Sequence, residues 1–257
     1  MITLTDYQRK YRFFRLERSA DGVLTVTFHT NGGPLVWGLE PLEEIGYLWA
    51  DVGSDRGNKI VIVTGTGDGF IPTMVVSGDA RMSADAWGKI ASDVRRMIRN
   101  HLSIEVPMIA AVNGAARFHS EEALLCDIVI ASSDAVFQDS PHFVSGMVPG
   151  DGVQIIYNHL LGLNRGRYFL FTGQEISAAR ALELGLIGEV HSRGALIGRA
   201  QELARLVLKQ PEHVRRGTRQ VSIEPLRRLY SGYVEHGLGL EGLGAWGGWP
   251  FEGGDLK

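Results

Sequence analysis

His142 and Asp151 lie on either side of a Gly-Pro-Gly loop in the segment SPHFVSGMVPGDGV, residues 140–153. A histidine side chain has an ordinary pKa of about 6.5, so it can take a proton from water near neutral pH. A carboxylate bonded to its second ring nitrogen would fix the tautomer and stabilise the imidazolium. A simpler interpretation also fits, because a histidine can sit in a turn and Asp151 can cap the helix that follows. The segment alone leaves both interpretations open.

The composition of the 257-residue chain indicates a globular protein and disfavours several partners. Hydrophobic residues make up 44% and charged residues 21%, enough for a sizeable core. A net charge of −3 without a Lys/Arg-rich run argues against nucleic acid and anionic membranes. The apolar runs are too short to span a membrane, and the first residues lack the apolar block of a signal peptide. A single cysteine, Cys126, allows no intrachain disulfide; we expect it in the core of a cytoplasmic protein.

Strand and helix patterns alternate through most of the chain, and the strand segments are continuous apolar runs. This arrangement is typical of parallel strands joined by crossover helices. A hairpin is predicted around the turn SADG, 19–22, and a helix capped by Ser83 is predicted over 83–102. The pattern turns purely helical after about residue 193, which divides the chain into a core, 1–192, and a helical region, 193–257. Its end, from residue 244 on, is too rich in glycine to be predicted as helix.

Neither the glycine-rich segment nor the histidines of the chain have the spacing of a cofactor site. The segment VTGTGDGF, 63–70, follows a predicted strand, but its spacing fits neither G-x-G-x-x-G nor a P-loop, so we interpret it as a tight turn. The eight histidines show no metal-ligand spacing such as H-x-x-x-H. We therefore expect no nucleotide cofactor and no metal.

Five segments occur in a recognisable order and spacing: IVIVTGTGDGF at 60–70, IEVPMIAAVNGAA at 104–116, CDIVIASSDAVF at 126–137, GMVPGDG at 146–152 and GRYFLFTGQEISAARALELGLIGEV at 166–190. Together they resemble the crotonase (enoyl-CoA hydratase/isomerase) superfamily across nearly the whole chain. The resemblance implies an α/β fold, a crotonase-like spiral of repeated ββα units. It also implies that the C-terminal helical region serves trimerisation, and hence a homotrimer or a dimer of trimers.

The first departures from the CoA-dependent pattern lie where CoA would approach. Those members carry a run of small residues after the TGxGxxF stretch, and this chain has IPTMVVSGD, 71–79. Pro72 lacks a backbone N–H there, while Met74 and Val75 add bulk. The resemblance therefore implies a reaction without CoA.

Further departures lie at the catalytic positions. His119 falls where the second oxyanion glycine is usual, and Glu122 matches the first catalytic glutamate of the hydratases. His142 stands at the second catalytic glutamate, and Asp151 replaces a small residue of the neighbouring loop. This set resembles the β-diketone hydrolase branch of the superfamily, the 6-oxocamphor hydrolase type.

That resemblance implies a hydrolase that cleaves a carbon–carbon bond of a cyclic or bicyclic β-diketone by a retro-Claisen reaction, giving a keto acid. His142 with Asp151 would activate water, and His119 and Trp37 would hold the carbonyl or enolate oxygen. Glu241 would orient His119 or hold a water, a task that Glu122 could share. The pocket is expected to be lined by Trp37, Met74, Val75, Met82, Trp87 and Phe143.

Two other functions remain open from the sequence. The first is an acyl-CoA hydratase, isomerase or thioesterase of the same fold that uses Glu122. The second is a trimeric scaffold that has lost catalysis.

Overall fold

The structure is a computed structural model that describes residues 2–75 and 82–246. Its largest sheet has six strands in the order β1-β2-β4-β7-β9-β12. Their bounds are Phe14–Arg18, Val23–Phe28, Ile60–Thr64, Met108–Val112, Ile128–Ser132 and Glu189–His191. β1 and β2 form an antiparallel hairpin, and every other neighbouring pair is parallel. The hairpin expected around residues 19–22 and the parallel strands are thus confirmed.

Short strands follow the long ones and form two smaller sheets. A four-stranded sheet has the order β11-β10-β8-β5, and β3 pairs with β6 in parallel. Their bounds are Val36–Trp37 for β3, Gly69–Ile71 for β5, Thr73–Met74 for β6, Ala115–Ala116 for β8, Val136–Phe137 for β10 and Ile176–Ser177 for β11. Because β4, β7 and β9 are each followed by a short strand of the second layer, the chain repeats a ββα unit. This confirms the crotonase-like spiral.

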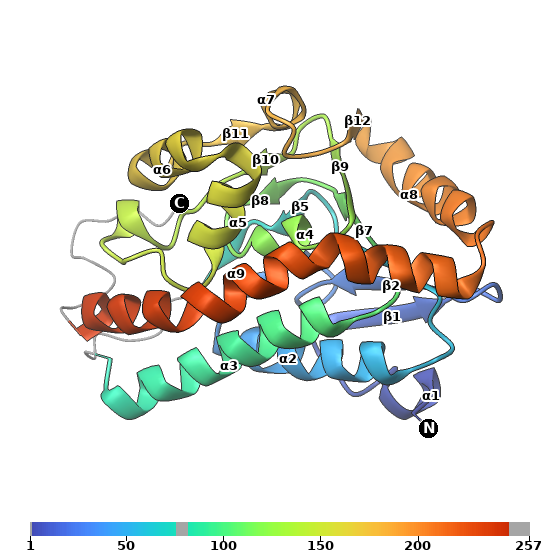
Figure 1. The fold of residues 1–257 in the computed structure, drawn as a ribbon, viewed down its shortest axis with the longest axis horizontal. Helices are drawn as coiled ribbons and strands as arrows, with labels where there is room; N and C mark the ends of the chain where they lie inside the picture. Colours follow the sequence, from blue (N-terminus) through green and yellow to red (C-terminus); the bar gives the residue numbers. More distant parts are fainter. Residues whose placement is uncertain (1, 76–81, 247–257) are drawn as a thin grey trace.

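The helices lie outside these sheets. Their bounds are Leu4–Tyr7 for α1, Leu39–Ser54 for α2, Ala84–Ser103 for α3, Glu121–Leu124 for α4, Val153–Leu161 for α5, Leu163–Thr172 for α6, Ala178–Glu183 for α7, Arg193–Leu208 for α8 and Glu212–Trp246 for α9. A 3₁₀ turn, η1, spans Phe143–Ser145. Figure 1 shows α9 running across the molecule beside α3, with α2 next to α3, while α8 packs on one face of the six-stranded sheet.

The central strands are buried on both faces, which explains their continuous apolar runs. In β4, Ile60 and Ile62 face α8, where they pack with Leu196 and Leu203, while Val61 belongs to the larger core on the opposite face. Helix α8 therefore packs directly on the six-stranded sheet. The boundary that we placed at residue 192 marks the point where the sequence pattern becomes purely helical. Cys126 is buried, as expected.

Local signals located helix starts better than helix ends. The Ser83 hydroxyl accepts a hydrogen bond from the Ala86 N–H at 3.1 Å, which confirms this cap of α3. The expectation that the chain is not helical from residue 244 is wrong for 244–246, because α9 continues to Trp246. The reason is tertiary packing: Ala245 is fully buried, and packing can outweigh the low helix propensity of glycine. Residues 247–254 of this expectation lie outside the described residues.

No helix within residues 2–75 and 82–246 combines the length and the hydropathy needed to cross a bilayer.

The loop before α5 touches the backbone of α9. A Cβ added to Gly150 would lie 2.2 Å from the carbonyl oxygen of Gly237, and a Cβ added to Gly237 would lie 2.2 Å from that of Gly150. These glycines therefore set how closely α9 approaches the loop that carries Asp151.

We expect Gly237→Ala to lower the free energy of unfolding by about 1–3 kcal/mol, because the new methyl group forces two backbones apart. Gly239→Ala on the same helix is the matched control. Nothing lies within 4 Å of its added Cβ, so it should stabilise the helix by up to about 1 kcal/mol. Urea unfolding of both variants tests the contact, and equal effects would contradict it.

Candidate active site

Six ionisable side chains converge where three loops meet helix α9. They are His119 and Glu121 after β8, Asp139 and His142 after β10, Asp151 before α5, and Glu241 on α9. We call this set the histidine–carboxylate cluster. All but His119 are classed as buried, and the His119 side chain is only 9% exposed. Charged groups that are this far from water need partners, and the cluster supplies them.

The two ring nitrogens of His142 contact different carboxylates. Its Nδ1 lies 2.5 Å from Oδ1 of Asp139, a hydrogen-bond distance. Its Nε2 lies 3.5 Å from Oδ2 of Asp151 and 3.5 Å from Oε1 of Glu241. One nitrogen is therefore held by a carboxylate of its own loop, and the other faces the rest of the cluster.

Asp151 divides its two oxygens between structure and site. Oδ1 accepts a hydrogen bond from the Val153 N–H at 3.1 Å at the start of α5. Oδ2 lies between the two histidines, 3.5 Å from His142 Nε2 and 3.6 Å from His119 Nδ1. The N-cap of α5 is Gly152, so the expectation that Asp151 caps this helix is not met; its bond to Val153 lies one residue earlier and leaves Oδ2 free to face the histidines.

His119 adopts an unusual backbone conformation. Its φ is 43°, in the left-handed region where glycine is common and histidine is rare. This agrees with the family resemblance, in which His119 falls where an oxyanion glycine is usual. Its Nδ1 lies 2.6 Å from Oε1 of Glu121, and its ring packs against that of Trp37 with centroids 4.4 Å apart.

Two hydrogen-bond donors near His119 have no protein acceptor in the part of the chain that the structure describes. They are the Nε2 side of the His119 ring and the indole N–H of Trp37. Trp37 is 2% exposed and comes from β3, whose register pairs it with Met74 of β6. Both donors are therefore available to an oxygen atom of a bound molecule.

Glu241 brings the last helix into the cluster. Its Oε1 faces His142, while Oε2 is buried and has no hydrogen-bond partner among the described residues. Burial raises the pKa of Glu241 to about 7, against the opposing effect of the His142 hydrogen bond. A carboxyl group with such a pKa can exchange a proton near neutral pH.

The pKa values of His119 and His142 are both raised by their surroundings. Burial alone would lower the pKa of His142, but Asp139 and Asp151 outweigh it and hold the pKa well above the ordinary 6.5. Burial likewise opposes the proton on His119, yet Glu121 and Asp151 raise its pKa to about 9. The surroundings therefore favour the doubly protonated, positively charged form of both rings near neutral pH.

The structure separates two adjacent glutamates that the sequence presents as one pair. Glu121 points to His119, whereas Glu122 accepts a hydrogen bond from the Trp49 indole N–H at 2.8 Å and lies 3.2 Å from His101 Nδ1. Glu122 is fully buried there, and its carboxylate bonds to Trp49 and His101 and not to a side chain of the cluster in the described ranges. It anchors α4 to the core.

Sequence reasoning missed Glu121 and Asp139. The signal for Glu121 was its position two residues after His119, and the signal for Asp139 was its spacing of three residues before His142. Such spacings are common in ordinary loops, so the loop conformations decide which carboxylate reaches a ring.

The expected pocket-lining residues are placed unequally. Trp37 and Met74 are paired neighbours, and Met82 is half-buried. Trp87 packs on α9 beside Glu241, since a Cβ added to Gly242 would lie 2.3 Å from its indole nitrogen. Val75 is 60% exposed, and its N–H bonds to the Trp37 carbonyl. The rest of the 71–79 run, from residue 76, lies outside the described residues.

Phe143 does not point into the cluster. It is 48% exposed and packs against Phe171 of α6 with ring centroids 5.0 Å apart. The physical reason is that η1 directs the residue after His142 outward. The proposal that Phe143 lines the pocket therefore has no support in this geometry.

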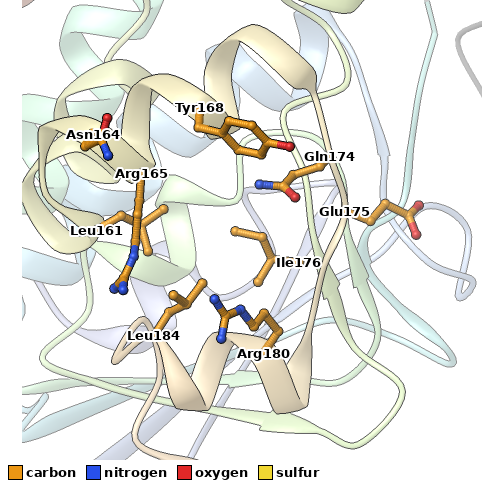
Figure 2. A pocket seen from close by; sticks show the side chains of 9 residues that line it. All are labelled: Leu161, Asn164, Arg165, Tyr168, Gln174, Glu175, Ile176, Arg180 and Leu184. Atoms are coloured by element: carbon orange, nitrogen blue, oxygen red, sulfur yellow. The ribbon is translucent and has the colours of Figure 1, made fainter.

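A surface pocket of roughly 290 Å³ lies elsewhere, between α6 and α7. Figure 2 shows the Arg165 and Arg180 side chains extending into it from the two helices. Arg180 already pairs with Glu183, and no residue of the histidine–carboxylate cluster lines this pocket. We assign it no part in the site.

Two overlapping triplets of the cluster have the donor atoms of a metal site. They are His119, Glu121 and Asp151, and His142, Asp151 and Glu241, each with ligand atoms within 4.8 Å of one another. A histidine must be unprotonated to bind a metal, whereas the carboxylates here raise the pKa of both rings. A metal ion would therefore have to displace a proton from each ring that it bound.

The fold and a match to a family model both identify the family of this chain. Residues 36–227 match the family model described as enoyl-CoA hydratase/isomerase, and the chain belongs to this family.

Solved structures match this chain over nine tenths of its length, among them one at 41% identity. It is a β-diketone hydrolase from the cyanobacterium Anabaena sp. PCC 7120 bound to (S)-3-oxocyclohexyl acetic acid. Its TM-score is 0.91 and its identity 41%, over 94% of this chain and 97% of that chain. An enoyl-CoA hydratase/isomerase from Mycobacterium paratuberculosis, with a TM-score of 0.83 and 23% identity over 91% of this chain and 94% of that one, is similar in fold.

Curated relatives match over a shorter length. A short-chain-enoyl-CoA hydratase of Clostridium acetobutylicum is 32% identical over 171 residues, 66% of this chain and 65% of that protein. A probable peroxisomal enoyl-CoA hydratase of Arabidopsis thaliana is 28% identical over 66% of this chain and 63% of that protein. The chain thus matches slightly less than two thirds of the length of either relative.

Proposed function

We propose that the protein hydrolyses a carbon–carbon bond of a cyclic or bicyclic β-diketone by a retro-Claisen reaction, without CoA, and releases a keto acid. The observation that carries this proposal is the convergence of His119, His142, Asp151 and Glu241 in one buried cluster. The hydrolase of 41% identity supports it, because the compound bound in that protein is itself a keto acid.

The geometry favours a different division of the proton transfers from the one expected from the sequence. A protonated His142 is a proton donor, and Glu241, with a pKa of about 7, is the better acceptor for a proton of water. Asp151 lies between the two rings and stabilises both imidazolium charges.

The proposed reaction begins with the attack of water on one carbonyl carbon of the diketone. Glu241 takes a proton as the water oxygen bonds to one carbonyl carbon, and the bond between that carbon and the central carbon then breaks. Its electron pair remains on the central carbon as an enolate, whose oxygen is held by His119 Nε2–H and the Trp37 indole N–H. His142 gives its proton to the enolate carbon and regains one from Glu241, so that one water is consumed.

The test uses a bicyclic β-diketone as the first probe. Such a diketone is derived from 3-oxocyclohexyl acetic acid by one new bond. The bond joins the acid carbon to a ring carbon beside the ketone, namely the one on the side away from the side chain. We expect its absorbance to fall as one equivalent of keto acid forms, with and without a metal chelator. Failure to cleave this compound and a panel of cyclic β-diketones would refute the proposal.

The hydratase names of the curated relatives favour a second candidate, an acyl-CoA reaction. Glu122, which that reaction would need, is bonded to Trp49 in the core, and this is evidence against it. Calorimetric titration with CoA separates the two, because tight binding would favour the acyl-CoA reaction.

We also propose that the protein is a cytoplasmic homotrimer or dimer of trimers, as the family resemblance implies. Light scattering of the purified protein measures the number of subunits directly.

We expect a bell-shaped dependence of kcat/KM on pH. Activity should rise as the pH passes about 7, because Glu241 accepts a proton only after losing its own. It should fall near pH 9, because His119 keeps Nδ1–H toward Glu121 and loses the proton of Nε2. Initial rates between pH 5 and pH 10 measure both limbs. Glu241→Gln should remove the acidic limb; an unchanged profile would show that another group causes it.

A further inference from the structure

Three carboxylates approach His142: that of Asp139 lies at Nδ1, and those of Asp151 and Glu241 lie at Nε2. Asp139 Oδ1 lies 2.5 Å from Nδ1, while Asp151 Oδ2 lies 3.5 Å from Nε2. Only the first distance is that of a direct hydrogen bond. The contact that orients the ring is therefore the one with Asp139.

We propose that Asp139 is the positioning residue of the site: it holds the proton of His142 on Nδ1 and thereby makes Nε2 the nitrogen that exchanges a proton during the reaction. Asp151 then has a different task, on the reactive side of the ring and between both histidines. What the proton on Nε2 does rests on the proposed function; the orientation of the ring does not.

The loop that joins the two residues is held in place independently. The Ser145 hydroxyl donates to the Ser140 carbonyl at 2.7 Å, and the Ser140 N–H donates to the Arg117 carbonyl at 3.1 Å. Pro141 restricts the backbone between Asp139 and His142. The carboxylate thus needs little rearrangement to hold the ring, which is what precise positioning of a reacting group requires.

The surroundings of Asp139 make the contact selective. Asp139 is 3% exposed, and its Oδ2 is buried without a hydrogen-bond partner in the described ranges. Among the residues that the structure describes, His142 is the side chain that bonds to this carboxylate. A buried carboxylate needs a nearby positive charge, so Asp139 favours the protonated ring and accounts for much of the raised pKa of His142.

The opposite interpretation is that Asp139 only stabilises its loop. The two differ in what happens to the ring when the carboxylate becomes an amide. An asparagine amide can donate a hydrogen bond to Nδ1, which would favour a neutral ring with its proton on Nε2. A loop-stabilising role would leave the tautomer and the pKa of the ring unchanged.

The experiment is nitrogen NMR of the intact protein labelled with ¹⁵N-histidine, with the His142 signals assigned from a His142→Gln sample. In the wild type we expect Nδ1 of His142 to stay protonated from pH 6 to pH 8. In Asp139→Asn we expect the midpoint of the ring titration to fall by at least about one pH unit. We also expect kcat for diketone cleavage to fall by about 10²–10⁴-fold.

Asp134→Asn is the matched control, because Asp134 lies in the preceding turn and its ion pair with Arg193 is on the surface. It should change neither the His142 signals nor kcat. Unaltered His142 signals in folded Asp139→Asn would overturn the proposal. If that variant does not fold, the wild type still decides, since a neutral ring protonated only on Nε2 would also overturn it. Absence of diketone cleavage would refute the proposed function alone.

Discussion

His142→Ala is expected to lower kcat for diketone cleavage by about 10²–10⁴-fold while the protein stays folded. The variant removes the proton donor to the enolate carbon and leaves the carboxylates of Asp139 and Asp151 without their shared cation. KM should change much less, because His119 and Trp37 still hold the substrate oxygen. Steady-state kinetics on the bicyclic diketone, together with circular dichroism, measure both effects.

His159→Ala is the matched control for this experiment. His159 lies in α5, the helix that begins two residues after Asp151, and it is exposed. It should retain wild-type kcat. If the His142 and His159 variants were equally active, His142 would have no part in the chemistry, and the proton transfers would have to be reassigned within the cluster.

Arg219→Ala is expected to lower the free energy of unfolding by about 3–5 kcal/mol. Arg219 on α9 is 1% exposed and donates from Nη1 to Asp127 Oδ2 at 2.5 Å and from Nε to the Ile104 carbonyl at 2.7 Å. The same Asp127 oxygen accepts the Met108 N–H at the start of β7. Removing the guanidinium leaves a carboxylate without its charge partner at the junction of α9 with the sheet.

Arg228→Ala gives the comparison on the same helix. The Arg228 side chain is 80% exposed, and its ion pair with Glu224 is a surface pair four residues apart. We expect a change within about 0.5 kcal/mol. Urea unfolding followed by fluorescence and by circular dichroism measures both variants. An Arg219 effect as small as that of Arg228 would contradict the anchoring role.

The fold could be predicted from the sequence because its signals are local and repeated. The apolar runs of β4, β7 and β9 are buried on both faces, and parallel strands with crossover helices produce that pattern. Ser83 marked the start of α3 because a capping hydroxyl acts within a few residues. The end of α9 could not be predicted in this way, because packing of Ala245 decides it.

The site could be predicted only in part. The positions of His119, His142 and Asp151 followed from departures in a family pattern, and the structure brings these three together. The partners of each ring depend on loop conformation, so Glu122 was expected in the place that Glu121 occupies. Which carboxylate reaches Nδ1 of His142 is likewise a property of the loop geometry.

The close contact between Gly150 and Gly237 has a consequence for how the protein matures. The site takes Trp37 from near one end of the chain and Glu241 from near the other. During synthesis, Glu241 emerges after the other members of the histidine–carboxylate cluster and joins them only when α9 docks against the Asp151 loop. A chain that stops before residue 241 therefore lacks one carboxylate of the histidine–carboxylate cluster, and the cluster is complete only in chains that include this part of α9.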